Sequence, residues 1–325
     1  MPQKTIEVEH LSKIYGSTVA IKDIDFSVDA GEIIGFLGPN GAGKTTTMRI
    51  LAGYLPATTG TAKIAGYDVH LHSMQARRHI GYLPETPPLY LEMTVKQYLH
   101  FVAKIKGVRA GSRCKQVEDA MVRCQLVERQ NTIIRKLSKG YRQRIGIAQA
   151  IVHQPSVIIL DEPTVGLDPR QIIEVRKLIK SLAGEHTIIL STHILPEASM
   201  ICDRVTIINQ GRAIATNTPQ GLQAQLESSS GYEVEIAGDF ESIILLLPKI
   251  PGIIRVTSNP SSLFNNSQHR LLKISCEPIL ELGKDIAKLI IERGLDLYEL
   301  RRTSPSLEDV FLKLTTEEPL EIESQ

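Results

Sequence analysis

The sequence lacks tryptophan altogether, and aromatic residues make up only 5% of its 325 residues. The core must therefore be built mainly from isoleucine, leucine, valine and alanine. Long apolar runs are also missing, since IILLL at 243–247 is far shorter than the roughly 20 residues of a membrane-spanning helix. The opening segment MPQKTIEVEH contains no apolar signal-peptide core. We therefore expect the chain to remain in the cytoplasm.

Cysteine is scarce and scattered. The spacing of the four cysteines includes no C-x-x-C pair and suits neither a zinc site nor a disulfide framework. We predict reduced thiols, most of them buried, at Cys114, Cys124, Cys202 and Cys276. The triplet HLH at 70–72 resembles a metal-binding sequence, but no further ligands accompany it. A surface turn is therefore favoured over a metal site there.

A strong excess of either charge is absent too, since the net charge is +1. This balance conceals an asymmetry: residues 1–222 hold 27 Lys and Arg against 19 Asp and Glu, whereas residues 223–325 hold 10 against 17. The difference predicts two units with different roles. The most basic part, 74–144, has 15 Lys and Arg against 5 acids. A solvated helical face is the simplest explanation, and a surface near anionic lipid or an acidic partner is the alternative.

Periodicity predicts an α/β layered first unit with a helical insert. Residues 5–16 alternate apolar and polar side chains, which favours an edge strand. A helix should follow Lys44 and stop at Gly53. The other expected elements are two strands around DAGE within 20–38, helices within 92–136, a strand at 156–163, a helix at 169–183, a strand at 187–193, and a hairpin at 204–219 with its turn at 210–211. The first domain should span 1–222, with a helical subdomain at about 86–155.

The serine run 228–230 marks a change of composition and predicts a linker. A small α+β domain should follow at 223–316, with the β-α-β-β-α-β order of a ferredoxin-like fold. Its expected elements are strand 232–237, helix 240–248, strands 252–258 and 270–276, helix 278–293 and strand 295–302. A last helix should begin at the N-cap Ser306, with Asp309 three residues later. An acidic tail, 317–325, should end the chain.

The most specific motif lies between an apolar strand and a helix. GPNGAGKT, at 38–45, matches the G-x-x-x-x-G-K-[ST] phosphate loop. Its glycines let backbone N–H groups wrap around phosphates, and the helix N-terminus adds partial positive charge. Lys44 should neutralise the β- and γ-phosphates, while the Thr45 hydroxyl holds Mg²⁺. The predicted phosphate-binding residues are Gly38, Pro39, Asn40, Gly41, Ala42, Gly43, Lys44, Thr45 and Thr46.

A second motif, VIILDEP at 157–163, places two carboxylates at the end of an apolar strand. Asp161 should reach the Mg²⁺ shell, and Glu162 can orient or deprotonate the attacking water. An Asp-Glu pair at a strand end is common by itself. Downstream of a phosphate loop, with a helical region between, it indicates a nucleotide-hydrolysing site.

Three further segments, in order with these motifs, resemble the ATP-binding subunit of ABC transporters over about residues 4–222. LSKGYRQR at 137–144 is similar to the family's signature motif, GLD at 166–168 to its D-loop, and His193 in STH to its switch histidine. Tyr15 matches the aromatic residue that stacks on adenine in the family. The implied fold is a P-loop ABC ATPase domain with a helical subdomain, followed by the small α+β ferredoxin-like domain.

The resemblance implies a head-to-tail dimer of two ATP-binding subunits, expected to be a homodimer, with two ATP molecules held between them. Ser138 and Gly140 would contact the γ-phosphate that the partner's phosphate loop binds, and Asp168 is counted among the nucleotide-binding residues. An ordinary helix cap would explain Ser138 but not the motifs around it. Lys139 and Tyr141 depart from the glycine and glutamine that are frequent here, without removing the serine or the backbone N–H groups.

A further departure concerns the segment IGYLPETPPLY, which is similar to the family's Q-loop. Glu85 stands where the family usually has glutamine, and a carboxylate there can also ligand Mg²⁺ or orient water. Bacterial exporters of the ABC-2 type often have LPE at this place. The C-terminal unit ending in SLEDVFLKLT also resembles that subset, which includes gliding-motility, copper-processing and multidrug types.

The resemblance therefore implies an ATPase subunit that energises a separate transmembrane permease from the cytoplasmic face of the inner membrane. In this scheme Glu162 is the catalytic base, His193 stabilises the γ-phosphate, and Thr45, Glu85 and Asp161 serve Mg²⁺. The permease's coupling helix would dock at the basic helical region after Glu85. The alternative is a soluble ABC-type ATPase acting on nucleic acid or ribosomes, and a small-molecule sensing role for the C-terminal unit is a third hypothesis. A single phosphate loop and the absence of a long coiled coil disfavour the alternative, so no nucleic-acid partner is expected.

Overall fold

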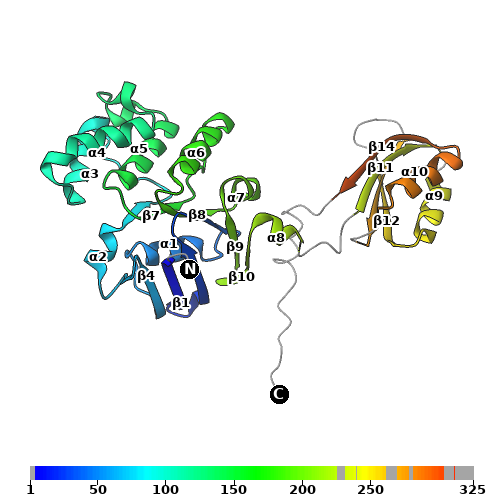
Figure 1. Ribbon diagram of the computed structural model, residues 1–325, viewed down its shortest axis with the longest axis horizontal. Coiled ribbons are helices and arrows are strands. Elements are labelled where there is room, and N and C mark those ends of the chain that lie inside the picture. Colours follow the sequence, from blue (N-terminus) through cyan, green and yellow to red (C-terminus); the bar gives the residue numbers. More distant parts are fainter. Residues whose placement is uncertain are drawn as a thin grey trace, which may run out of the picture. The chain divides into compact units, whose positions relative to one another are not determined.

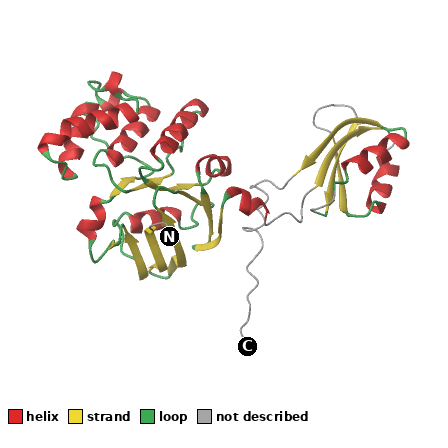
Figure 2. Ribbon diagram, in the orientation of Figure 1, coloured by secondary structure: helices red, strands yellow, loops and turns green. Residues whose placement is uncertain are grey.

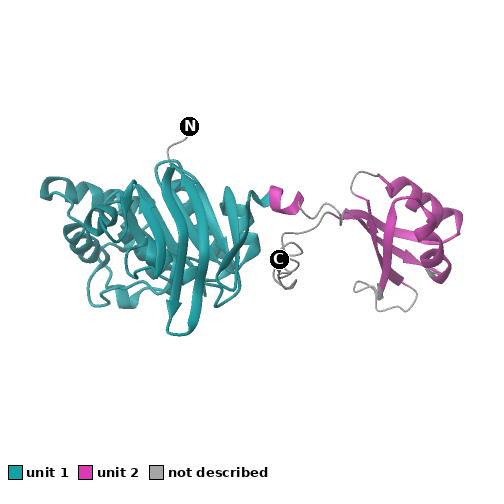
Figure 3. Cartoon of the chain, turned by 90° about the horizontal axis from the view of Figure 1, so that it is seen from below, with its two compact units in different colours: residues 1–219 teal, residues 220–325 magenta. Residues whose placement is uncertain are grey.

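The computed structural model describes residues 4–224, 231–238, 240–260, 269–277, 281–303 and 311. The chain divides into two units, Met1–Pro219 and Gln220–Gln325, which Figure 3 colours separately. This division lies three residues before the boundary expected from the sequence. No helix in the described part of the chain is both long and apolar enough to cross a membrane.

A six-stranded sheet, in the order β10-β9-β3-β8-β7-β6, runs through the first unit (Figure 1). Two of its inner strands, β3 (Ile33–Leu37) and β7 (Val157–Asp161), are mostly apolar and buried at every residue, as is typical of parallel strands covered on both faces. The other strands are β6 (Ile80–Leu83), β8 (Thr187–Thr192), β9 (Arg204–Asn209) and β10 (Arg212–Asn217). β9 and β10 form the predicted hairpin, in which Gln210 and Gly211 have the positive φ angles (48° and 79°) of a tight turn.

A second, antiparallel sheet has the order β2-β1-β4-β5. The strand predicted at 5–16 is β1 (Lys4–Tyr15), but it lies between two partners, so the expectation of an edge strand is wrong. Its second partner is β4 (Thr59–Ile64), whose sequence TGTAKI has little apolar alternation to predict it. β2 (Thr18–Asp29) precedes the DAGE turn as expected, yet β2 and β3 belong to different sheets. The short β5 (Tyr67–Asp68) completes the antiparallel sheet.

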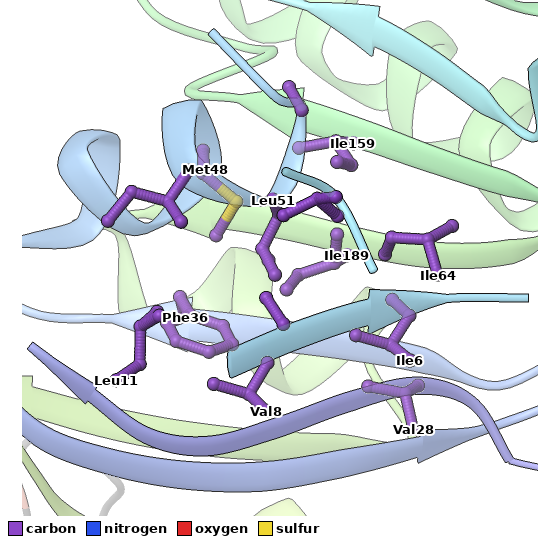
Figure 4. Packing of buried hydrophobic residues seen from close by; sticks show 14 of the residues in the cluster. Ile6, Val8, Leu11, Val28, Phe36, Met48, Leu51, Ile64, Ile159 and Ile189 are labelled. Atoms are coloured by element: carbon purple, nitrogen blue, oxygen red, sulfur yellow. The ribbon is translucent and has the colours of Figure 1, made fainter. Parts of the chain in front are cut away.

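The core of the first unit lies between the antiparallel sheet, the parallel sheet and helix α1 (Lys44–Leu51) (Figure 4). Met48 and Leu51 of α1 are completely buried in it, as is Phe36 of β3. Val8 of β1 packs into the same cluster from the antiparallel sheet. This packing fixes the position of α1, and with it the loop that precedes the helix.

The predicted helical insert begins at a well-capped helix. The Thr94 hydroxyl accepts a hydrogen bond from the backbone N–H of Gln97, and the Gln97 side chain accepts one from the N–H of Thr94, which completes a capping box. The helices of the insert are α3 (Val95–Ile105), α4 (Ala110–Arg123) and α5 (Lys139–Ile151), with 3-10 turns at Val127–Arg129 and Ile134–Lys136. They pack against one another on one side of the parallel sheet, away from β1 and β4 (Figures 1 and 2). The other helices described before residue 225 are α2 (Ser73–Arg78), α6 (Pro169–Leu182), α7 (Leu195–Ile201) and α8 (Pro219–Ala224).

The second unit has its own antiparallel sheet, in the order β12-β13-β11-β14, and its own core. Its described elements follow in the order β-α-β-β-α-β: β11 (Gly231–Ala237), α9 (Phe240–Leu246), β12 (Ile253–Pro260), β13 (His269–Cys276), α10 (Gly283–Glu292) and β14 (Asp296–Thr303). Alternate residues of β11, among them Val234 and Ile236, are buried in one cluster with Ile286 and Ile290 of α10. The linker at 228–230, the helix expected from Ser306 and the acidic tail lie outside the described residues, except for Phe311.

Candidate functional site

The loop between β3 and α1 has a backbone that requires glycine. A Cβ atom on Gly38 would lie 2.3 Å from the carbonyl oxygen of Ile208, far inside contact distance. Gly41 and Gly43 have φ angles of 83° and 105°, in the left-handed region that other residues rarely enter. The sequence therefore produces a tightly curled loop ahead of a helix, which is the shape of a phosphate cradle.

Lys44, the first residue of α1, turns its ammonium group back into this loop. Its Nζ atom donates to the carbonyl oxygens of Gly38 and Pro39, at 2.8 and 3.1 Å. It also lies 3.5 Å from Oε1 of Glu162, and only 5% of the lysine is exposed. A buried ammonium beside an inward-facing loop is suited to bind an anion that enters the loop.

Asp161, at the end of β7, meets hydroxyl groups from two other elements. Its Oδ1 atom accepts hydrogen bonds from Oγ1 of Thr45 (3.2 Å) and Oγ of Ser191 (2.6 Å). Burial raises the pKa of Asp161 above its usual range, and the charges of Glu162 and Glu85 act in the same direction. Hydroxyl and carboxylate oxygens are the ligands that Mg²⁺ prefers, so these residues fit the predicted ion.

Glu162 is held in an uncommon backbone conformation directly after the strand. Its φ angle is 48°, which is rare for a residue other than glycine, and its N–H donates to Oγ of Ser191 at 2.9 Å. Nδ1 of His193 lies 2.9 Å from Oε2 of Glu162, and because a carboxylate can only accept, the imidazole donates this bond. Such strain near a charged cluster is often part of a functional site.

Lys44, Thr45, Glu162 and His193 line one cavity of about 230 Å³. The sequence-predicted residues that line it are Asn40, Gly41, Ala42, Gly43, Lys44, Thr45, Thr46, Glu85, Glu162 and His193. The structure therefore brings the phosphate loop, the Q-loop position, the candidate base and the switch histidine together. The predicted residues outside this lining are Tyr15, Gly38, Pro39, Ser138, Gly140, Asp161 and Asp168, although Asp161 accepts a hydrogen bond from the lining residue Thr45.

The signature segment borders a different cavity, of about 440 Å³. Ser138 is the N-cap of α5, where its hydroxyl accepts from the N–H of Tyr141 at 3.4 Å. A Cβ atom on Gly140 would lie 2.5 Å from Oε1 of Gln171, so the glutamine side chain would have to shift to admit one. Asp168 is the N-cap of the neighbouring α6 and accepts from the N–H of the same Gln171 at 2.9 Å. The signature and D-loop segments therefore meet each other within the chain.

Tyr15 ends β1 with its ring partly open to solvent. The residue is 45% exposed, and Nζ of Lys13 lies 5.2 Å from the ring centroid. An exposed aromatic ring of this kind can stack on a planar ligand, as the sequence predicts for adenine.

Sequence reasoning missed a buried acid, Glu197, on α7. It is 1% exposed, and its Oε2 atom accepts from the hydroxyls of Thr164 (2.6 Å) and Thr192 (3.2 Å). Its Oε1 atom lies 3.2 Å from Nη2 of Arg176 on α6. Thr164 follows Glu162 by two residues and Thr192 precedes His193, so Glu197 joins the segments that carry both. The one feature of the sequence that could have pointed to Glu197 is its position four residues after His193.

The cysteine and HLH predictions concern residues that do not line this cavity. All four cysteines are free; Cys114 is exposed and the other three are buried, as predicted for most of them. His70 lies in an exposed turn, where its N–H donates to Oδ1 of Asp68 at 2.8 Å. Within the described ranges, the one group of three or more His, Cys, Asp or Glu side chains with ligand atoms within 4.8 Å of one another is His10, Asp23 and Asp25, which are all exposed.

Comparison with known proteins gives consistent matches. A family model described as ABC transporter matches residues 21–165. The linearmycin resistance ATP-binding protein LnrL of Bacillus subtilis (strain 168) is 31% identical over 315 residues, covering 95% of this chain and 98% of LnrL. The bacitracin transport ATP-binding protein BcrA of Bacillus licheniformis is 33% identical over 320 residues, covering 95% of this chain and 96% of BcrA. A solved structure of the ATP-binding subunit of an ABC transporter shares 32% identity with a TM-score of 0.62, covering 68% of this chain and 93% of that one.

Proposed function

Because this chain belongs to the ATP-binding subunits of ABC transporters, in the subset that serves ABC-2 type exporters, we propose that it couples ATP hydrolysis to export through a separate membrane permease. One observation carries the proposal: a single cavity gathers the phosphate loop with Glu85, Glu162 and His193. The relatives support the transport function, since BcrA is named for bacitracin transport and LnrL for linearmycin resistance.

The phosphate loop would bind the triphosphate of ATP. Its N–H groups and Lys44 would hold the β- and γ-phosphates, and phosphate oxygens would replace the carbonyl oxygens that Lys44 now contacts. Thr45 and Asp161, with Glu85 at the cavity wall, are the residues that would hold Mg²⁺. When bound, Mg²⁺ neutralises charge on the phosphates.

Glu162 is the residue best placed to activate water. Its carboxylate lies in the cavity, and the hydrogen bond from His193 fixes its orientation. The hydroxyl of Ser191 accepts a hydrogen bond from the N–H of Glu162 and donates one to Asp161. The same hydroxyl therefore positions the candidate base and the candidate metal ligand. A carboxylate held in this way can accept the proton of the attacking water.

A dimer would complete the site. Ser138 and Gly140 border a cavity that shares no lining residue with the nucleotide cavity. Ser138 is exposed and its hydroxyl only accepts the bond from the N–H of Tyr141, so it can still donate to a nucleotide bound by another subunit. Head-to-tail pairing of two chains would place each signature segment against the partner's phosphate loop, as the resemblance to the family implies.

The permease would bind a groove of about 740 Å³ next to the Q-loop. Tyr54, Arg77 and Lys106 contribute to its lining, and Tyr54 is 74% exposed. Pro84 lines the groove while the next residue, Glu85, lines the nucleotide cavity, so one short segment contacts both. Aromatic and basic side chains are common at protein interfaces, and this groove would place the permease where it responds to bound nucleotide. Peripheral attachment to the membrane follows from this arrangement.

Co-purification tests the proposal against the alternative of an ATPase acting on ribosomes or nucleic acid. The full chain, purified in detergent from its native membranes, should be recovered together with a polytopic membrane protein. Tyr54→Glu places a charge in the groove and should abolish recovery without loss of ATPase activity. Ile173→Glu, at an exposed site on α6 (51% exposed), is the matched control and should retain it. A wild-type chain that recovers no permease and instead sediments with ribosomes would support the alternative.

A further inference from the structure

A second basic cavity, of about 520 Å³, lies beside the proposed permease groove. Its lining comes from the end of α2 (Arg78), the turn between α3 and α4 (Lys106 and Arg109), the first turn of α4 (Ser112) and the segment after α5 (His153). Gly107, Val108 and Gln116 complete the lining, so no carboxylate contributes to it. Lys106 also lines the permease groove, which makes the two hollows neighbours.

The positive charges of this cavity have no acidic partner among the residues that the structure describes. Among the ion pairs formed by described residues, none includes Arg78, Lys106 or Arg109. Lys106 is partly buried, and its Nζ atom donates to the carbonyl oxygen of Ile80 at 3.3 Å. Burial, followed by the charge of Arg77, lowers the pKa of Lys106. A buried cation without a counter-ion costs free energy, and an anion in the cavity would remove that cost.

His153 adds an unsatisfied polar atom. Nε2 lies 3.0 Å from the carbonyl oxygen of Ile80, which can only accept, so Nε2 carries the proton. Nδ1 is inaccessible and has no hydrogen-bond partner in the part of the chain that the structure describes. Burial, and then the charge of Lys106, lowers the pKa of His153 to about 4. A bound anion would offset the charge of Lys106 and so raise the pKa of His153.

We propose that this cavity binds the phosphate group of an anionic membrane lipid, beside the bound permease. Two arginines, a lysine and a serine line one cavity, and arginine is the side chain best matched to phosphate oxygens. The choice of a lipid rests on the proposed function, because a permease in the adjacent groove would bring the headgroup region of the bilayer close. A free phosphate group would satisfy the same donors, so the experiments separate these sources.

The first experiment tests for a phosphate site with the imidazole of His153 as a local reporter. The full chain, labelled with ¹⁵N-histidine and saturated with Mg-ADP to occupy the phosphate loop, is titrated with inorganic phosphate and with glycerol 1-phosphate. The His153 signal, assigned with His153→Gln, should shift in a saturable way. Ser112→Glu supplies a carboxylate inside the cavity and should abolish the shift, and an acid in the first turn of a helix is compatible with folding.

Val122→Glu is the matched control, since it adds the same charge to the same helix at an exposed site outside the cavity (58% exposed). It should leave the His153 shift unchanged. A His153 signal that does not respond to phosphate, or that responds equally in Ser112→Glu, would overturn the phosphate site.

The second experiment identifies the source of the phosphate. Full chains are floated with vesicles of phosphatidylcholine alone or of phosphatidylcholine with phosphatidylglycerol. A single added charge should weaken general attraction to the anionic vesicles by about fivefold, which is the effect expected of Val122→Glu. Ser112→Glu should weaken binding by about 25-fold or more, because it fills the site as well as adding a charge.

If Ser112→Glu and Val122→Glu lose vesicle binding equally, the attraction is diffuse, and this result would overturn the lipid site. Binding of soluble phosphate without vesicle binding would assign the cavity to a free phosphate compound, which also contradicts the lipid proposal. Loss of permease co-purification in Ser112→Glu, with vesicle binding unchanged, would show an acidic segment of the permease as the occupant. If the variant still co-purifies with the permease, the proposed function is supported whatever the vesicle experiment shows.

Discussion

Glu162 combines three features that single residues seldom share: a positive φ angle, a position in the nucleotide cavity and a direct hydrogen bond from His193. Glu162→Gln keeps the shape of the side chain but cannot accept a proton from water. Turnover should fall by about 10²- to 10⁴-fold, while ATP binding persists. Steady-state ATPase assays and equilibrium nucleotide titration on the same preparation measure the two effects.

Glu185→Gln is the matched control for that prediction, because Glu185 is an exposed acid that pairs with Arg123 outside the cavity. It should retain wild-type turnover. If Glu162→Gln turns over ATP as fast as the control, Glu162 is not the catalytic base.

The residues of the phosphate loop could be predicted because their chemistry depends on a local motif. Ser191 could not, although it binds both Asp161 and the N–H of Glu162. It reaches them only because β7 and β8 pair in parallel, in a register that places Asp161 opposite Ser191. Register between distant strands is a property of the folded sheet, so a single sequence carries no local signal for this contact.

At the level of elements, the wrong expectation that β1 is an edge strand also comes from pairing between segments that are distant in the sequence. Alternation of apolar and polar residues indicated a strand with one buried face, and β1 is such a strand. Whether a strand is at an edge depends on its neighbours, and β4 arrives more than forty residues later to pair with it. The weak pattern of β4, which includes Gly60 at a φ angle of 85°, concealed that partner.

Glu197 shows how neighbouring elements of the site are held together. It accepts hydrogen bonds from Thr164 and Thr192 and pairs with Arg176, all in a buried setting. Glu197→Gln removes the charge and leaves Arg176 without its counter-ion. We expect the first unit to lose about 3–5 kcal/mol of stability. Turnover should fall by about 10- to 100-fold, because the segments that carry Glu162 and His193 lose their common anchor.

Hydrogen exchange in α7 under mild denaturant measures the loss of stability, and ATPase assays measure turnover. Glu185→Gln serves again as the control, since its ion pair is exposed (61% for Glu185) and should contribute less than about 1 kcal/mol. A Glu197→Gln variant as stable and as active as this control would show that the buried network positions nothing.

In the second unit, Glu233 of β11 lies between cations on both neighbouring strands. It pairs with Arg301 of β14 and, at 3.1 Å, with Lys273 of β13. The hydrogen bond from Arg301, and then that from Lys273, lowers the pKa of Glu233 below its ordinary value of 4.5. A lowered folded-state pKa means that this stabilisation is complete above pH 4.5 and is lost as the pH falls through the folded-state value.

Glu233→Gln should therefore cost about 1 kcal/mol at pH 7 and progressively less below pH 4.5, because protonation of the wild type removes the same charge. Denaturant titration, read from hydrogen exchange in β11 at several pH values, gives the difference. Glu292→Gln is the control, since its ion pair with Lys288 joins exposed side chains one helical turn apart. A difference between wild type and Glu233→Gln that stays constant with pH would contradict the assigned pairing.

For the whole molecule, a sequence with two opposite charge balances folds into two units, each with its own core. The order of elements in the second unit could be predicted because strand and helix periods are local. The boundary was harder to place, since α8 begins at Pro219 and continues across it. The proposed relation between the signature segment and a nucleotide would involve two chains, since within one chain the two cavities have separate linings.

That relation leads to a prediction about mixed dimers. Lys44→Ala disables the phosphate loop, and Ser138→Arg blocks the signature segment. If sites are shared between chains, pairing a Lys44→Ala chain with a Ser138→Arg chain puts both lesions in one site and leaves the other intact. Placing both substitutions in one chain, opposite a wild-type partner, damages both sites. Residual ATPase activity or nucleotide trapping should therefore be found in the first mixture only.

Two affinity tags allow each mixed dimer to be isolated, and trapping is measured beside hydrolysis because one intact site can hold nucleotide even where turnover needs two. Dimers that carry a single lesion in both chains are the controls, and they should be inactive because every site is damaged. If each chain instead completed its own site, the wild-type chain of the second mixture would stay whole and the order of activities would reverse. Greater activity in the second mixture would therefore contradict a role of Ser138 in the partner's nucleotide site. Its function would then be the one seen within a single chain, the N-cap of α5.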